Sequence, residues 1–439
     1  MKILWLTNYA LPMIAEALGN EKIVNEGWLI GLSKQLMMNS DVELTVVYPQ
    51  SGITKQITGI TEKLRFYGYP ELSNKIDYNI LLKQDFIEII YKEKPDVIHI
   101  MGSEFPHCYS MVEACIACDY ISRAVISIQG LVSICIHHYD LGLPHDALHQ
   151  RSIRDIIKRD SLQKYKKELY KRGRYEVLAL SQVKNVIGRT DWDRACTMQI
   201  NPEVKYYFNN ETLRPPFYGK LWSQNECEPY SLFISQGNNP IKGLHFALKA
   251  LPLIRKRYPN VKLYIAGSEV LKKKQSYPKW KRKAYENFLF ELIENDNLSD
   301  NIVFCGTLNE TQMCERYLKS NVYISPSLIE NSPNSIGEAM LLGVPVVASD
   351  VGGVKNLLVH GKEGFIYQAD AFYMLAYYVC EILSSKELAK KLSNNAMRHA
   401  TVTHNALNNA ATLISIYHDI SFHAASNINI NELDELING

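Results

Sequence analysis

The chain has 439 residues, 46% of them apolar, and its formal net charge is only +2. That length is enough for two domains of about 200 residues, each with its own core. The nearly neutral charge argues against a nucleic-acid partner, which would favour an excess of basic side chains. No apolar run approaches the length that a helix needs to cross a bilayer.

Nine cysteines are scattered through apolar segments without regular pairing. This usage predicts a reducing compartment and therefore a cytoplasmic location. Cys115 and Cys118 form a single CxxC, which a structural zinc site would need to pair with a second. Thr7 and Asn8 interrupt the apolar N-terminus early, so we expect a buried first strand there rather than an export signal.

In the first half of the chain, short apolar runs alternate with amphipathic segments. We expect strands at 2–6, 41–48, 97–101, 124–128 and 186–190, with helices at 27–36 and 82–92. Residues 206–217 look irregular and contain Pro215 and Pro216, so the domain boundary is expected between there and Pro229.

Residues 151–174 are unusually basic, with ten cations against three acids. Apolar residues interleave with the charges at roughly helical spacing, which predicts an amphipathic basic helix. Such a helix is compatible with docking on an anionic membrane surface. The alternative is a helix whose charged face is solvated and whose apolar face packs on its own domain.

The second half repeats the alternation. We expect strands at 231–235, 261–266, 302–305, 322–324, 345–348 and 365–367, and helices at 333–342, 374–383, 388–398 and 406–417. Ser325-Pro326-Ser327 ends one strand, and Ser332 is expected to cap the helix that follows and ends at Gly343. The start of that helix, near Asn334 and Ser335, offers backbone N–H groups and a positive dipole end to an anion such as a diphosphate.

These residues carry a family resemblance. Glu330 and, eight positions on, Glu338 are followed by Ala339-Met340, Gly343 and Pro345-Val346-Val347, with Ser325-Pro326-Ser327 upstream. This pattern resembles the signature of the retaining glycosyltransferases of family four, which have the GT-B fold. The resemblance implies an α/β protein with two Rossmann-like doubly wound domains that face a central cleft, and a last helix that crosses back to the first domain.

The resemblance implies a donor site for a nucleotide sugar, such as a UDP- or GDP-sugar. Glu338 would hold the ribose and Glu330 the hydroxyls of the transferred sugar, while Lys242, Asn334 and Ser335 would hold the diphosphate. The family places an arginine six residues before that lysine, where this chain has Gln236. The loop that follows Gly306 would touch the base.

For the first half, the resemblance implies further site residues. Gly27 stands where a glycine loop approaches the donor phosphates, and His99, in PDVIH, matches a motif at a strand end and would join the catalytic residues. Gln129 stands where many relatives have a histidine that faces the acceptor, and His137 and His138 could substitute for it. A glutamine can orient a hydroxyl but cannot take its proton.

We therefore predict a retaining, metal-independent glycosyltransferase that needs no cofactor and acts on a saccharide or lipid-linked saccharide, in cell-surface polysaccharide or glycolipid biosynthesis. The predicted domains are 1–220 on the acceptor side and 221–403 for the nucleotide sugar, then a crossover helix at 404–420 and a tail at 421–439. The predicted location is cytoplasmic, with peripheral attachment to the inner face of the plasma membrane through residues 151–174.

Two alternatives stay open. A dehydrogenase would also be a two-domain α/β protein, but the sequence contains no GxG for its dinucleotide fingerprint. A non-catalytic subunit that binds nucleotide sugars is compatible with Gln129 and Gln236. The motif Asp191-Trp192-Asp193 matches the DxD with which metal-dependent transferases hold a divalent ion. Asp191 is nevertheless better explained as a helix cap and Asp193 as a first-turn acid.

Overall fold

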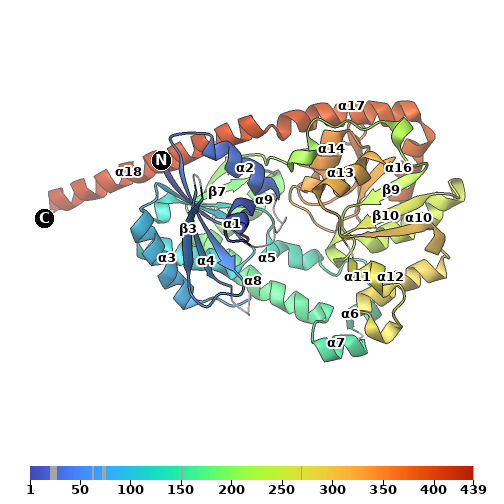
Figure 1. The fold of residues 1–439 in the computed structure, drawn as a ribbon, viewed down its shortest axis with the longest axis horizontal. Helices are drawn as coiled ribbons and strands as arrows, with labels where there is room; N and C mark the ends of the chain where they lie inside the picture. Colours follow the sequence, from blue (N-terminus) through green and yellow to red (C-terminus); the bar gives the residue numbers. More distant parts are fainter. Residues whose placement is uncertain (20–26, 62–63, 72–75, 150–151, 268, 439) are drawn as a thin grey trace. The chain divides into compact units, whose positions relative to one another are not determined.

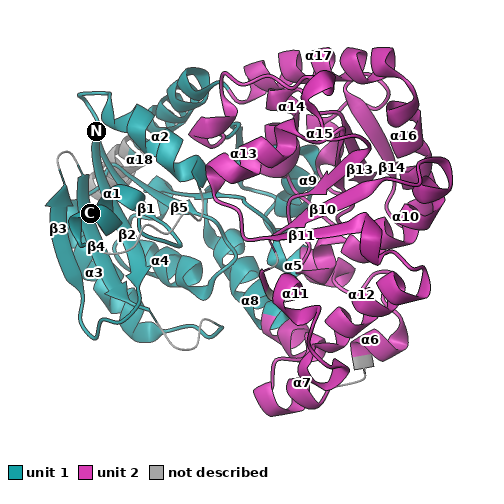
Figure 2. Cartoon of the chain, turned by 45° about the vertical axis from the view of Figure 1, so that its right-hand side comes forward, with its two compact units in different colours: residues 1–134, 169–212, 405–439 teal, residues 135–168, 213–404 magenta. Residues whose placement is uncertain are grey.

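The computed structural model describes residues 1–439 except 20–26, 62–63, 72–75, 150–151, 268 and 439, and beyond residue 424 it describes the backbone only. The chain divides into two compact units (Figure 2). Unit 1 comprises residues 1–134, 169–212 and 405–439, and unit 2 comprises residues 135–168 and 213–404. The structure thus groups residues 135–168, which we expected in the first domain, with the second unit.

Unit 1 is built on a sheet whose strands, among the described residues, lie in the order β3-β4-β2-β1-β5-β6-β7-β8 (Figure 1). The strands are β1 (Lys2–Leu6), β2 (Glu43–Gln50), β3 (Ile57–Thr61), β4 (Leu64–Pro70), β5 (Val97–Met101), β6 (Ala124–Ser127), β7 (Asn185–Gly188) and β8 (Lys205–Phe208). Neighbouring strands are parallel except for β3 and β4. The strand order reverses direction between β1 and β5, which is where doubly wound sheets bind ligands.

Helices cover both faces of this sheet because its strands are apolar on both sides. Leu4 and Leu6 pack with α3 (Ile80–Glu93) and α4 (Pro106–Ala117). Ile3 and Trp5 pack on the opposite face, with α2 (Gly27–Met37) and the last helix. Unit 1 also contains α1 (Pro12–Ala17), most of α5 (Val132–Cys135), α9 (Asp191–Ile200) and the C-terminal part of α8 (Leu162–Gln182).

The last helix, α18 (Ala406–Asn438), belongs to unit 1. Leu413, Ile416, Tyr417 and Ile420 are buried in the same core as Trp5. The Tyr417 hydroxyl accepts a hydrogen bond from the indole N–H of Trp5, at 2.9 Å. The expected return of the chain to its first domain is therefore present, although the helix continues well past the expected end at residue 417.

Unit 2 contains a parallel sheet whose strands, where the structure describes the chain, follow the order β11-β10-β9-β12-β13-β14. The strands are β9 (Ser231–Ile234), β10 (Lys262–Ala266), β11 (Ile302–Gly306), β12 (Val322–Ser325), β13 (Val346–Asp350) and β14 (Gly364–Gln368). Here the order reverses between β9 and β12, so the loops after these two strands lie at the position that binds ligands in such sheets.

Two apolar cores cover the faces of this second sheet. One contains Leu232 and Ile234 with α10 (Leu244–Arg257), α12 (Ala284–Asn295) and α16 (Phe372–Ser384). The other contains Phe233 and Tyr323 with α13 (Glu310–Leu318), α14 (Asn334–Leu342) and α17 (Lys386–Thr403). Both units are therefore doubly wound α/β sheets, as predicted.

Several elements of the structure differ from the expected ones. The basic segment 151–174 is not one helix: α7 (Ile153–Lys158) ends at Arg159, whose φ of +51° is left-handed, and α8 begins at Leu162. Residues 205–208, part of the stretch expected to be irregular, form β8. The cap of α9 is Thr190 rather than Asp191.

Among the residues that the structure describes, none belongs to a helix long and apolar enough to cross a membrane.

Candidate functional site

Lys242 and Glu330 form an ion pair at the strand reversal of unit 2. Lys242 ends the short 3-10 helix (Pro240–Lys242) that follows β9, and Glu330 lies in the loop after β12. The Lys242 Nζ and the Glu330 Oε1 are 2.6 Å apart, and the Ser327 hydroxyl donates to the same oxygen at 2.7 Å. The structure thus brings together two of the three residues expected to be catalytic.

Glycines allow the loops around this pair to approach closely. Gly243 has φ +68°, and a Cβ there would collide with the Pro326 carbonyl oxygen. Gly352 has φ +48°, and a Cβ there would collide with the Glu330 carbonyl oxygen. Any other residue at either position would both strain the backbone and separate the loops that hold Lys242 and Glu330.

The ion pair keeps Lys242 charged. Partial burial alone lowers the pKa of its ammonium, but the charge and hydrogen bond of Glu330 outweigh burial and raise that pKa above the ordinary value. The side chain keeps 29% of its surface exposed. An ammonium has three donors, so Lys242 can retain Glu330 and still bind a phosphate oxygen.

Helix α14 starts four residues after Glu330 and contributes its N-terminus to this region. Its cap position is Pro333, which makes no side-chain cap bond, and Asn334 and Ser335 are its first two residues. The first backbone N–H groups of a helix and its positive dipole end attract anions. The predicted cap at Ser332 lies one residue too early.

Glu338 lies one turn further along α14 and is 3% exposed. Its carboxylate accepts two hydrogen bonds from the Arg214 guanidinium, Nε to Oε1 at 2.6 Å and Nη2 to Oε2 at 2.7 Å. Burial nevertheless raises the pKa of Glu338. Sequence reasoning missed Arg214, although an arginine directly before two prolines in an apolar stretch is a detectable signal.

The other expected donor residues lie at strand ends of the same unit. Gln236 is exposed and lies two residues after β9. Because its side chain is a neutral amide, it supplies no fixed charge beside Lys242. Gly306 is the last residue of β11 and has φ +78°. Their contact with a donor stays a prediction.

His99, the third residue expected to be catalytic, lies inside unit 1. It is 1% exposed on β5, and its ring nitrogens are 2.6 Å from the Tyr417 hydroxyl and 2.6 Å from the Ser127 hydroxyl. Burial lowers the pKa of the ring to about 3, so the imidazole is neutral at physiological pH. Both nitrogens already bind internal hydroxyls, which favours a structural role for His99.

Gln129 belongs to a polar cluster at the ends of β6 and β7. Its amide nitrogen donates to Glu211 at 2.7 Å, and its amide oxygen is 3.5 Å from Arg189. Arg189 and Glu211 are buried and form an ion pair with each other. The cluster and His99 line the same small pocket of unit 1.

Three further expected site residues stand apart from this cluster. His137 and His138 end a 3-10 helix in unit 2, so they do not belong to the unit that holds Gln129. Gly27 is the first residue of α2 and is buried, while the residues directly before it, 20–26, lie outside the described residues.

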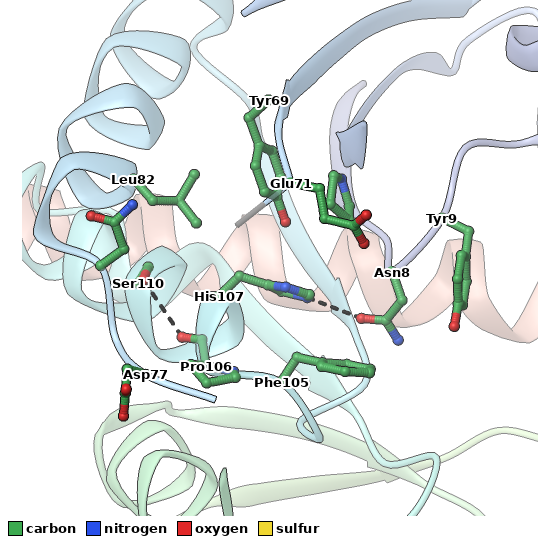
Figure 3. A pocket seen from close by; sticks show the side chains of 12 residues that line it. Asn8, Tyr9, Tyr69, Glu71, Asp77, Leu82, Phe105, Pro106, His107 and Ser110 are labelled. Atoms are coloured by element: carbon green, nitrogen blue, oxygen red, sulfur yellow. Dashed lines mark hydrogen bonds between the residues drawn. The ribbon is translucent and has the colours of Figure 1, made fainter. Parts of the chain in front are cut away.

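Unit 1 has a larger pocket at its own strand reversal, shown in Figure 3. Asn8 and Tyr9 follow β1, Tyr69 is the second-last residue of β4, and Phe105 and His107 stand at the start of α4. The His107 Nε2 and the Asn8 Oδ1 are 2.9 Å apart, and the Phe105 and His107 rings stack with centroids 5.6 Å apart. Our sequence reasoning missed this pocket because its residues come from four separate loops.

Asp193 is explained by helix capping. The Thr190 hydroxyl accepts from the Asp193 N–H at 3.0 Å, and the Asp193 carboxylate accepts from the backbone N–H groups of Arg189 and Thr190. The Asp193 carboxylate also accepts a hydrogen bond from the Tyr206 hydroxyl and is fully buried. The capping box and this bond therefore account for the carboxylate.

Comparison with solved structures defines the fold. The chain superposes on sucrose-phosphate synthase from Thermosynechococcus elongatus with TM-score 0.67 at 15% identity, over 96% of this chain and 99% of that one. It superposes on Anabaena HepE, solved in complex with UDP and glucose, with TM-score 0.62 at 16% identity, over 95% of this chain and 100% of that one. The protein therefore has the GT-B fold.

Comparison with protein families then places its second unit. Residues 222–399 match the family described as glycosyl transferases group 1, and this stretch of the chain is similar to members of that family. The match covers β9 to α17 and includes both Lys242 and Glu330.

Two curated relatives match shorter stretches of the chain. An uncharacterized glycosyltransferase of Methanocaldococcus jannaschii is 27% identical over 176 residues, which are 40% of this chain and 41% of the relative. The capsular polysaccharide biosynthesis glycosyltransferase CapM of Staphylococcus aureus is 27% identical over 163 residues, 36% of this chain and 37% of the relative. The matches thus span about two fifths of these relatives.

Proposed function

We propose that this protein is a retaining glycosyltransferase that moves a sugar from a nucleotide sugar to a saccharide or lipid-linked saccharide acceptor. The observation that carries the proposal is the Lys242–Glu330 pair beside the N-terminus of α14, at the strand reversal of a unit similar to glycosyl transferases group 1. A relative in capsular polysaccharide biosynthesis supports cell-surface polysaccharide or glycolipid synthesis as its setting.

In this proposal, the donor diphosphate binds between Lys242 and the first turn of α14. As the glycosidic bond breaks, negative charge grows on the leaving phosphate, and a fixed ammonium with aligned backbone N–H groups stabilises that charge. These groups replace the divalent ion that other transferases use, so the reaction is metal-independent. That a UDP complex is known for Anabaena HepE supports a nucleoside diphosphate as the ligand.

Glu330 has two tasks in the proposed reaction. It orients Lys242 through the 2.6 Å contact, and its carboxylate accepts hydrogen bonds from hydroxyls of the transferred sugar. The acceptor attacks on the face from which the phosphate leaves, and a phosphate oxygen of the donor takes the acceptor proton. The anomeric configuration is thereby retained.

We place the acceptor in the unit 1 pocket of Figure 3. Tyr9 and Phe105 line this pocket with aromatic rings for the apolar side of a sugar ring, while Asn8, Glu71 and His107 line it with polar groups for its hydroxyls. Aromatic walls with a few convergent polar groups are typical of ligand sites.

A thermal-shift panel tests the proposal first. UDP-glucose, UDP-N-acetylglucosamine and GDP-mannose are each added to the full chain, because a ligand that binds only the folded state raises the unfolding temperature. We expect at least one of these nucleotide sugars to stabilise the protein and to be hydrolysed slowly when no acceptor is present. NMR of the first product should show the same anomeric configuration as in the donor. Stabilisation without any hydrolysis or transfer would instead indicate a non-catalytic subunit.

A further inference from the structure

Helix α7 of unit 2 is oriented with its polar side toward the protein. Asp155 is 3% exposed, and its carboxylate accepts from the Ala284 N–H at the start of α12, at 3.1 Å. Asp160, just beyond the helix, pairs with both Arg154 at 2.8 Å and Lys283 at 3.3 Å. Charged contacts therefore fix α7 to the body of unit 2.

The apolar side of α7 faces solvent as a result. Ile153, Ile156 and Ile157 have the i, i+3, i+4 spacing of a single helix face, and they are 56%, 59% and 70% exposed. Amphipathic helices of globular proteins normally bury that face. Three exposed isoleucines on six helical residues indicate a surface that is covered in use.

A second segment extends this surface. Helix α7 contacts the 3-10 helix Lys279–Lys281, where Trp280 is 51% exposed, and Tyr277 just before it is 41% exposed. Residues 271–283 carry seven basic side chains and no acidic one. Arg282 and Lys274 are buried and hold this segment in place, Arg282 by donating to the Lys274 carbonyl at 2.9 Å and Lys274 by pairing with Glu286 at 2.6 Å.

Exposed cations lie in the same two segments as these apolar residues. We call the whole surface the α7 patch: its apolar members are Ile153, Ile156, Ile157, Tyr277 and Trp280, and its exposed basic members are Lys158, Arg159, Lys272, Lys273, Lys279 and Lys281. The sequence holds these residues more than a hundred positions apart, in two segments that the fold brings into contact. Figures 1 and 2 both show α7 in the same part of unit 2 as α6 (His145–His149) and α12.

We propose that the α7 patch docks the protein on an anionic membrane surface. Branched aliphatic side chains with tryptophan, tyrosine and many lysines are the composition of segments that lie in the lipid headgroup region. Each lysine gains free energy near anionic lipid. Protein interfaces, by contrast, are depleted in lysine. This proposal does not depend on the proposed transferase reaction.

Flotation of the full chain with vesicles tests this. We expect binding to phosphatidylcholine vesicles that contain 30% phosphatidylglycerol, little binding to pure phosphatidylcholine, and release at about 0.5 M salt, where screening shortens the reach of surface charge. Lys279→Gln with Lys281→Gln should lower the partition coefficient about thirtyfold. Ile157→Ser should lower it about tenfold, since a branched aliphatic side chain leaves the lipid.

Matched variants on α17 control for charge and apolar content. Lys390→Gln with Lys391→Gln removes two exposed lysines elsewhere in unit 2, and Val402→Ser removes an apolar side chain that is 71% exposed, against 70% for Ile157. Neither control should change vesicle binding, and all variants should keep the unfolding temperature and nucleotide-sugar response of the natural protein.

Several results would overturn the proposal. Absence of binding to either vesicle, equal binding to neutral and anionic vesicles, or equal losses in patch and control variants would each do so. Self-association in sedimentation that Ile157→Ser abolishes, without vesicle binding, would assign the patch to a second copy of the chain instead.

Discussion

At the scale of single residues, Lys242 carries the largest predicted effect on activity. Lys242→Gln removes the charge that faces the proposed leaving phosphate, so donor hydrolysis should slow by about 100- to 1000-fold, as when another enzyme loses one fixed electrostatic group. Steady-state hydrolysis of the stabilising nucleotide sugar measures this. Lys256→Gln is the control because Lys256 is exposed on the last turn of α10. A similar loss in both variants would remove Lys242 from the site.

Glu338 and Arg214 allow a sharper test of the ribose contact. Glu338→Gln leaves the partly buried guanidinium unpaired and should lower the free energy of unfolding by about 1–3 kcal/mol. If Glu338 holds ribose, calorimetry should show weaker nucleotide binding in Glu338→Gln but not in Arg214→Met, which keeps the carboxylate. Equal losses would indicate that the ion pair only shapes the site.

The buried histidines predict a dependence of stability on pH. Burial lowers the folded-state pKa of His99 to about 3 and that of His245 to about 4, below the ordinary 6.5. Between those values and 6.5 the unfolded chain binds more protons, so stability is full above pH 6.5 and falls as pH decreases. Each histidine should cost about 2 kcal/mol at pH 5.

Urea unfolding from pH 7 to pH 5 checks this sign. His99→Gln keeps a polar side chain but removes the titration, so its free energy of unfolding should fall less steeply over that range. An unchanged slope would mean that His99 is not held neutral in the folded state.

At the scale of elements, the capping box of α9 predicts that Asp193 stabilises the fold and does not bind a metal. Asp193→Asn weakens hydrogen bonds to two backbone N–H groups and to Tyr206, so it should destabilise the protein by about 2 kcal/mol while activity per folded molecule persists. Activity in EDTA should also persist. Activity that is lost in chelator and restored by Mn²⁺ would contradict the metal-independent reaction.

Most elements of both sheets follow from apolar runs bounded by Gly, Pro and charged residues. Strand β5 matches its expected range because all five of its residues are buried. Strand β3, by contrast, was not expected, since its sequence ITGIT is half exposed at the sheet edge and lacks a continuous apolar run. The basic segment was expected as one helix because periodicity does not reveal the left-handed Arg159 that ends α7.

Candidate site residues can be predicted from the sequence where a local motif contains them, and not where distant loops meet. Glu330, Glu338 and Lys242 lie in local motifs, and the structure pairs two of them directly. Arg214 lies 124 positions before Glu338, and only the fold shows that it occupies both carboxylate oxygens. The unit 1 pocket and the α7 patch are likewise assembled from distant segments, so no local sequence pattern predicts them.

At the scale of the whole molecule, two doubly wound units with the GT-B fold each present a strand reversal with a set of polar residues. Unit 2 holds the charged pair and the helix N-terminus, and unit 1 holds the aromatic pocket. In the proposed reaction, the donor and the acceptor therefore bind to different units. A substitution in the unit 1 pocket should therefore leave donor binding and donor hydrolysis unchanged.

His107→Ala tests that division of labour. It removes the ring that stacks on Phe105 and contacts Asn8, so transfer to an acceptor should weaken through a higher KM for the acceptor. Donor hydrolysis and donor affinity should stay within about twofold of the natural protein. A loss of donor affinity equal to the loss of transfer would contradict separate sites.

Hydrogen exchange of the full chain with and without the stabilising nucleotide sugar tests directly where the donor binds. Donor bound between Lys242 and α14 should slow amide exchange in residues 235–245 and 326–340, because ligand contacts suppress local opening. Exchange in residues 277–281 of the α7 patch should not change. Slowing confined to unit 1, or no slowing at a saturating donor concentration, would contradict the placement of the donor site.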